Sequence, residues 1–146
     1  CQPKSKAVPI QLSDLRFSNT SECFEATLTI NNISHDLTIC DLNNSDYETG
    51  KTIAFKLKKW LEANLGKAKE FAASRLLQLK NESWLSENEM PINSKKFIEV
   101  IDLEGINVFG ENGFEIYFND GNLFWGHTII VAVDENFEFE DASIAG

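Results

Sequence analysis

The stretch DLTICDLNNSDYETGKTIAFKLKKWLEANL, residues 36–65, changes its hydrophobic period halfway along, and this change decides the fold class. Residues 36–42 alternate between apolar and polar side chains, which predicts a half-buried strand. Residues 43–46 (NNSD) predict a turn that also supplies a helix N-cap. The apolar residues that follow share one face at helical spacing: Ile53, Leu57, Trp60, Leu61 and Leu65. A strand is therefore followed directly by an amphipathic helix.

Strand patterns also precede this stretch. Residues 24–30 alternate and are rich in β-branched side chains, and the asparagines at 31–32 predict the turn that joins them to residues 36–42. A further short strand is expected within residues 12–18. These segments together predict a β-hairpin or a meander.

A second helix is expected after the first. Gly66 predicts a C-terminal cap, because glycine readily adopts the left-handed conformation that ends helices. The helical pattern resumes from about Lys67 to Lys80, which predicts two antiparallel helices joined at the glycine. Trp84 and Leu85 are expected to close the end of this helical hairpin.

The rest of the chain returns to strand periodicity after a loop over 86–93 and a short helix over 95–101, capped by Ser94. Strands are expected over 106–109, 114–118, 128–133 and 137–144. The order strands, helices, strands predicts an α+β fold in which a mostly antiparallel sheet packs against the helical hairpin. Residues 1–9 are expected to be a flexible N-terminal segment and residues 10–146 a single α+β domain.

Acidic residues dominate the last third of the chain, which contains no Lys or Arg after Lys96. Residues 97–146 hold eleven acids, whereas the first 96 residues hold twelve acids and all thirteen bases. The formal net charge of -10 therefore belongs to the C-terminal part. Such a field attracts cationic partners and disfavours nucleic acid and anionic membrane surfaces.

Three cysteines, Cys1, Cys23 and Cys40, are too few for a disulfide framework, and their number is odd. They predict reduced thiols and a cytoplasmic protein, with a Cys23–Cys40 bridge as the alternative. Cys1 would suit a lipoprotein module anchored through that residue, but we expect instead that an initiator methionine was removed or the chain shortened. Without lipid on Cys1 no membrane contact is expected, because no apolar run approaches the roughly 20 residues that span a bilayer.

Metal and cofactor sites lack their usual motifs. The two histidines, His35 and His127, are far apart, and no Cys-x-x-Cys or His-x-x-x-His pair accompanies them. The acidic run over 134–141 lacks the mid-loop glycine of an EF-hand. No glycine-rich phosphate loop is present. We therefore expect neither a bound metal nor a cofactor.

The densest local motif is DGNLFWGHTIIV, residues 120–131. Its Asp-Gly predicts a turn, and its apolar end predicts a central strand. One hypothesis is a small enzyme of unknown substrate in which His127 acts with Asp120. A single histidine at a strand entrance is more often a structural hydrogen-bonding group. Trp125 is a candidate anchor for a protein partner, because it is a large aromatic beside acids.

Three stretches of the chain resemble an uncharacterised bacterial family. They are LLQLKNESW (76–84), DGNLFWGHTI (120–129) and ASIAG (142–146). They match the patterns Leu-Leu-x-Leu-x-Asn-x-x-Trp, Asp-Gly-x-Leu-Phe-x-Gly-His-x-Ile and Ala-x-Ile-x-Gly. That family is a domain of unknown function and is similar to immunity proteins of contact-dependent growth inhibition and other polymorphic toxin systems. The resemblance implies a non-catalytic protein that blocks a toxin, and it supplies no catalytic residues.

The leading hypothesis is therefore an acidic binding protein that occludes a cognate toxin with a basic surface, most simply a nuclease. The expected partner-binding residues are the C-terminal acids and one aromatic anchor: Glu111, Glu115, Asp120, Trp125, Asp134, Glu135, Glu138, Glu140 and Asp141. Nucleic acid is not expected as a direct partner, because these acids repel phosphate.

Overall fold

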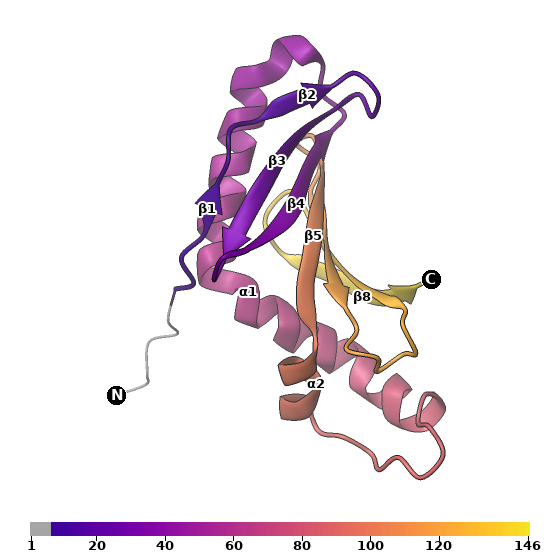
Figure 1. Cartoon of the computed structure of the whole chain (residues 1–146). Coiled ribbons are helices and arrows are strands. Elements are labelled where there is room, and N and C mark those ends of the chain that lie inside the picture. Colours follow the sequence, from indigo (N-terminus) through magenta and orange to yellow (C-terminus); the bar gives the residue numbers. More distant parts are fainter. Residues whose placement is uncertain (1–6) are drawn as a thin grey trace.

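The computed structural model describes residues 7–146 as one sheet crossed by a long helix (Figure 1). The strands are β1 (Gln11–Leu12), β2 (Arg16–Ser18), β3 (Cys23–Ile30), β4 (Ile33–Cys40), β5 (Asp102–Phe109), β6 (Phe114–Asn119), β7 (Thr128–Val133) and β8 (Phe139–Ala145). The helical elements are the 3-10 turn η1 (Asn44–Asp46), α1 (Tyr47–Ser83) and α2 (Ser94–Val100). The predicted α+β class and its order of strands, helices and strands are confirmed.

All strands belong to one sheet in the order β1-β3-β4-β5-β6-β7-β8, and β2 also pairs with β3. Every pair is antiparallel except β4–β5. Parallel neighbours need a long connection, which α1 and α2 provide. The predicted turn at Asn31 and Asn32 is confirmed, with φ values of 50° and 65°. Two consecutive positive φ values are typical of the two-residue turn whose twist suits a hairpin.

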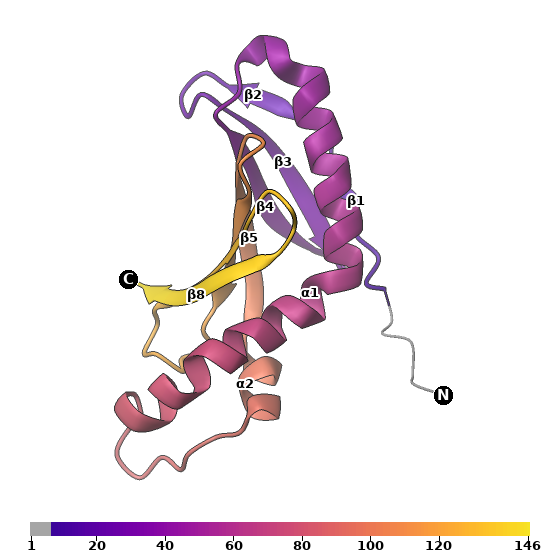
Figure 2. The same cartoon turned by 180° about the vertical axis from the view of Figure 1, so that it is seen from behind.

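The predicted helical hairpin is wrong. The segment forms a single helix, α1, which is 37 residues long and continues through Gly66. Its buried face runs on past the glycine, from Leu57 and Leu61 to Ala68 and Ala72. Steps of three and four residues keep these side chains on one stripe, so packing against the sheet favours continuation over a turn. Figures 1 and 2 show that α1 bends near its middle as it crosses the sheet.

The substitution Gly66→Ala should raise the free energy of unfolding by about 0.5–1 kcal/mol, because alanine favours helix and restricts the unfolded chain. A Cβ atom at Gly66 would meet nothing within 4 Å. Gly50→Ala is the control within α1, because its Cβ would lie 3.2 Å from Leu15 Cδ2 and 3.3 Å from Phe24 Cδ2. Urea unfolding should give Gly66→Ala a higher free energy of unfolding than Gly50→Ala. The reverse order would contradict this account.

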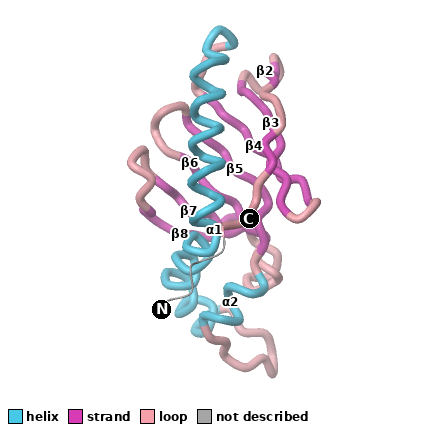
Figure 3. The backbone as a smooth tube through the Cα atoms, turned by 90° about the vertical axis from the view of Figure 1, so that its left-hand side faces the viewer, coloured by secondary structure: helices cyan, strands magenta, loops and turns pink. Residues whose placement is uncertain are grey.

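The core lies between α1 and one face of the sheet (Figure 3). The sheet contributes fully buried side chains from its central strands: Leu28, Leu37, Ile39, Ile116, Phe118, Ile129 and Val131. The opposite face carries the alternate residues of the same strands, among them the half-buried Thr38, Asn107 and Glu115, which are neighbours in register. This alternation is what the period of two in the sequence predicts.

The start of the described chain is attached to α1. The amide of Val8 donates to the carbonyl oxygen of Glu62 (2.9 Å), and the amide of Ile10 donates to Glu62 Oε2 (3.1 Å). Residues 1–6, the rest of the predicted flexible segment, lie outside the described residues. They include Cys1, the residue through which a lipoprotein module would be anchored. At α2 the N-cap is Asn93 rather than the predicted Ser94, because the Asn93 side chain accepts from the amide of Lys96 (2.9 Å).

Cys23 and Cys40 form a disulfide, so the prediction of reduced thiols is wrong for this pair. They continue the β3–β4 register beyond the pair Phe24–Ile39, and their Cα atoms are 4.4 Å apart. This separation is typical of directly opposed residues in a non-hydrogen-bonded pair, whose side chains share one face. The sequence predicted both strands, but only their register shows that the two cysteines oppose each other.

The double substitution Cys23→Ala/Cys40→Ala should lower the free energy of unfolding by about 3 kcal/mol, because it frees a 17-residue loop in the unfolded state. Denaturant unfolding with and without dithiothreitol measures the effect. Reductant should lower the stability of the parent chain by a similar amount and leave the double variant unchanged. An equal response of both proteins to reductant would contradict a role for the disulfide.

Candidate functional site

Seven of the predicted acids gather at one end of the sheet, where two turns meet. Residues 110–113 join β5 to β6, and residues 134–138 join β7 to β8. Because β6 and β7 are antiparallel neighbours that pair Phe114 with Val133, the two turns lie beside each other. We call this group the acidic end: Glu111, Glu115, Asp134, Glu135, Glu138, Glu140 and Asp141.

A cleft of about 520 Å³ lies between the first half of α1 and these two turns. Its rim carries the exposed residues Glu48, Glu111 and Glu135, together with Lys56. Its floor is apolar and is formed by Ile53, Leu57, Val108, Phe114 and Phe137. An acidic rim above an apolar floor suits a group that carries both aliphatic surface and positive charge.

Asp134 organises the β7–β8 turn. Its Oδ1 atom accepts hydrogen bonds from the backbone amides of Asn136 (2.8 Å) and Glu138 (3.0 Å). A side chain that bonds the backbone two residues on is the usual device that stabilises such a turn. The Asp134 side chain therefore stabilises the turn, whereas the exposed Glu135 beside it faces solvent at the rim of the cleft.

Phe137 belongs to the same turn and not to the last strand, which begins at Phe139 and not at residue 137 as predicted. Its φ of 61° is a left-handed conformation that glycine usually adopts. Its ring packs against Trp60 and Phe114, with centroid separations of 5.8 Å in both cases. These contacts hold an aromatic ring at the cleft despite the backbone cost.

Two acids of this end point to the sheet face opposite α1. Glu115 and Asp141 flank Ala132 in the register of β6, β7 and β8. Tyr117 follows Glu115 on the same face, and its pKa is raised by burial and by the charge of Glu115, with a hydrogen bond from Asn107 acting the other way. The acidic end therefore has two surfaces, the cleft on one side and this sheet face on the other.

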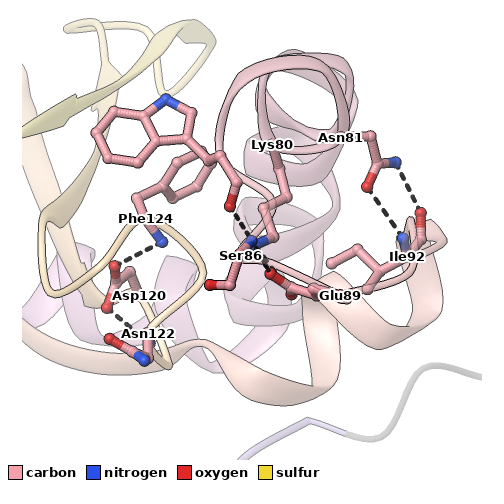
Figure 4. Close-up of polar contacts among 9 residues, drawn as sticks. Lys80, Asn81, Ser86, Glu89, Ile92, Asp120, Asn122 and Phe124 are labelled. Carbon is pink, nitrogen blue, oxygen red and sulfur yellow. Dashed lines mark hydrogen bonds and ion pairs between the residues drawn. The ribbon is translucent and has the colours of Figure 1, made fainter.

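Asp120 lies at the other end of the same strands and is 3 % exposed. Its Oδ1 accepts from the amide of Asn122 (2.8 Å), and its Oδ2 accepts from the amides of Phe124 (2.9 Å) and Gly126 (3.0 Å), as Figure 4 shows in part. The carboxylate thus organises the loop between β6 and β7. It is not available to a partner, so its place among the predicted partner-binding residues was wrong.

Trp125 and His127 lie on this loop, away from the acidic end. Trp125 is 55 % exposed with φ of 59°, and its ring centroid is 4.7 Å from that of Trp84. The His127 ring packs 5.1 Å from Trp84, and its Nδ1 contacts the carbonyl oxygen of Phe124. Asp120 and His127 each bond the loop backbone, and within residues 7–146 they make no hydrogen bond to each other.

Sequence reasoning missed a buried lysine at the end of α1. Lys80 is 1 % exposed; its Nζ donates to the carbonyl oxygen of Trp84 (2.8 Å) and lies 3.0 Å from Glu89 Oε2 (Figure 4). The amide of Ser86 and then Lys80 lower the pKa of Glu89 below its ordinary 4.5, since both stabilise the carboxylate. One signal was available, because Lys80 follows the buried Leu76 by four residues on the same helix face.

Asn81 fixes the loop that returns from α1 to α2. Its side-chain oxygen accepts from the amide of Ile92 and its side-chain nitrogen donates to the carbonyl oxygen of Ile92, both at 2.9 Å (Figure 4). The polar groups at this end of the molecule are thus used to hold loops. Those of the acidic end remain largely in solvent.

Among residues 7–146 no group of three or more His, Cys, Asp or Glu side chains is placed to hold a metal ion. Within the same residues, neither α1 nor α2 is long and apolar enough to cross a membrane.

A family model described as "uncharacterized protein conserved in bacteria (DUF2262)" matches residues 10–144. The chain belongs to the DUF2262 family. This match covers nearly all of the described fold and confirms the expected membership of an uncharacterised bacterial family. No curated protein and no solved structure matches the chain significantly. The roles of individual residues in this DUF2262 protein therefore rest on its own geometry.

In this DUF2262 chain, Asp120→Ala should lower the free energy of unfolding by about 3 kcal/mol, because three backbone amides lose a charged acceptor in a buried site. Asp102→Ala is the matched control. It removes an exposed aspartate and should change stability by less than about 0.5 kcal/mol. Thermal and urea unfolding compare the two variants. Equal effects would mean that the Asp120 hydrogen bonds do not stabilise the loop.

Proposed function

We propose that this chain is a non-catalytic binding protein that occludes a basic protein partner through its acidic end. In its most concrete form the proposal is an immunity protein that neutralises a cognate toxin, most simply a nuclease with a cationic active site. The observation that carries it is the gathering of seven acids at one end of the sheet, in and beside two adjacent turns, with no Lys or Arg after Lys96 in the sequence and with Lys56 as the cation that lines the cleft. A surface of this kind complements the one that a nuclease offers to phosphate.

The charge arrangement predicts how association should behave. Glu111, Glu135, Glu138 and Glu140 are exposed, so their field extends into solvent and can steer a cationic protein toward this end. Exposed charges separated by more than about 8–10 Å are screened at physiological salt. Association should therefore slow as salt rises, while dissociation changes less.

The contacts of Asp120 and His127 favour binding over catalysis. Both oxygens of Asp120 accept backbone amides, and His127 Nδ1 contacts a backbone carbonyl. An acid–base pair needs its two members within hydrogen-bonding reach. The enzyme hypothesis therefore gains no support from this loop.

Action in the cytoplasm is part of the proposal and imposes a condition. Cytoplasmic reductants keep most thiols reduced, so the fold would have to persist without the Cys23–Cys40 bond. A domain of ordinary stability, about 5–15 kcal/mol, can tolerate the loss of about 3 kcal/mol. The acidic end also lies on β6, β7 and β8, apart from the bridged β3 and β4.

The test is co-expression with the protein encoded immediately upstream, followed by co-purification and by association kinetics at two salt concentrations. Glu111→Lys/Glu135→Lys should slow association at least about tenfold, because it reverses two rim charges. Glu70→Lys/Glu99→Lys is the control, since it makes the same change in net charge at exposed helical positions outside the cleft. It should change the rate less than about threefold.

A partner that is toxic alone and harmless in the complex would support the immunity proposal. Equal effects of the two double variants would contradict binding through the acidic end. A partner that binds without any dependence on salt would contradict electrostatic steering.

A further inference from the structure

We infer that the cleft takes an amphipathic cationic segment of the partner, in which an arginine side chain lies next to an apolar one. This inference rests on the proposed function and names the chemistry that the cleft selects. Its basis is the cavity itself, whose volume of about 520 Å³ lies in the range of small-ligand sites.

The floor of the cleft requires an apolar group. Ile53 and Phe137 are half-buried, and Leu57, Val108 and Phe114 are buried beneath them. A fully hydrated cation would gain nothing from this surface, whereas an aliphatic or aromatic side chain would leave water on entering it. Charge alone therefore does not describe the ligand.

The rim requires a positive charge. Glu48, Glu111 and Glu135 are exposed around the opening, and Lys56 is the cation among the residues that line it. Glu48 comes from the first turn of α1, whereas Glu111 and Glu135 come from the two turns opposite. A guanidinium on a long aliphatic stem can lay the stem along the floor and present its five donors to carboxylates on both sides.

The site is preorganised. Asp134 holds the turn that carries Glu135, and Phe137 is held by Trp60 and Phe114 in a conformation unusual for a large side chain. Backbone strain of this kind persists where surrounding contacts enforce it, and it is concentrated at functional sites. A cleft that is already formed loses less conformational freedom when a ligand enters.

The neighbouring β5–β6 turn is held just as closely. A Cβ atom at Gly113 would lie 2.5 Å from the carbonyl oxygen of Val133, so only glycine permits this approach of the β5–β6 turn to the end of β7. The two adjacent turns that carry Glu111 and Glu135 are therefore fixed relative to each other.

The experiment is an NMR titration of the ¹⁵N-labelled chain with the blocked dipeptide acetyl-Leu-Arg-amide. Two matched probes separate the requirements: acetyl-Leu-citrulline-amide keeps the shape without the charge, and acetyl-Gly-Arg-amide keeps the charge without the apolar side chain. The first should give saturable shifts at the amides of residues 110–113 and 134–137 with millimolar affinity, and each control should bind at least about tenfold more weakly.

Two variants test the floor and the rim separately. Phe137→Gly suits the left-handed backbone but removes the ring, and Glu111→Gln/Glu135→Gln removes the rim charge at nearly constant shape. Each should weaken the dipeptide at least about fivefold, whereas Glu70→Gln should leave it unchanged. Melting curves for each variant confirm that it is folded before it is titrated.

Equal binding of acetyl-Gly-Arg-amide, unchanged binding by Phe137→Gly, or the absence of saturable shifts would overturn the inference. The proposed function fails separately. The upstream protein could bind with the predicted dependence on salt while the dipeptide gives no saturable shifts at the cleft. That result would support the proposed function and contradict this inference. Conversely, the dipeptide could bind as expected while the upstream protein does not bind. That result would support the inferred chemistry of the cleft and contradict the upstream protein as the partner.

Discussion

The parallel pairing of β4 with β5 is the constraint on which the rest of the structure depends. Every other strand pair is antiparallel, so this one pair separates the β1–β4 part of the sheet from the meander β5–β8. A parallel pair needs a crossover that returns the chain to the starting end of the sheet. The 37 residues of α1 provide that return and supply one continuous apolar face that covers both parts. The same helix forms one wall of the cleft.

The sequence predicted the strands and the fold class because side-chain alternation is a local signal, as in residues 36–42. It failed where a non-local contact decides the outcome. Gly66 stays helical because the sheet offers a surface to Ala68 and Ala72, and the cysteines bond because the β3–β4 register opposes them. Neither fact is visible in a short window of sequence.

The candidate site shows the same division. The charge of Glu111, Glu135 and their neighbours was evident, because composition alone shows an acidic third without Lys or Arg. Their separation from Trp125 was not evident, because it follows from which end of the antiparallel strands each turn occupies. Asp120 was misjudged for a related reason. An aspartate in a turn motif resembles a surface acid until the amides that it accepts are known.

The two ends of the β6–β7 pair use acidic groups in opposite ways. At one end Asp120 is buried, and Glu89 is paired with Lys80, so these carboxylates stabilise loops. At the other end Glu135, Glu138 and Glu140 are exposed and close in sequence, and their repulsion costs stability in the free chain. A cationic partner would relieve that repulsion, so the charge that destabilises the free protein contributes to the affinity of the complex. This coupling gives a physical reason for an end of the sheet at which the acids outnumber the basic residues, of which Lys56 is the one that lines the cleft.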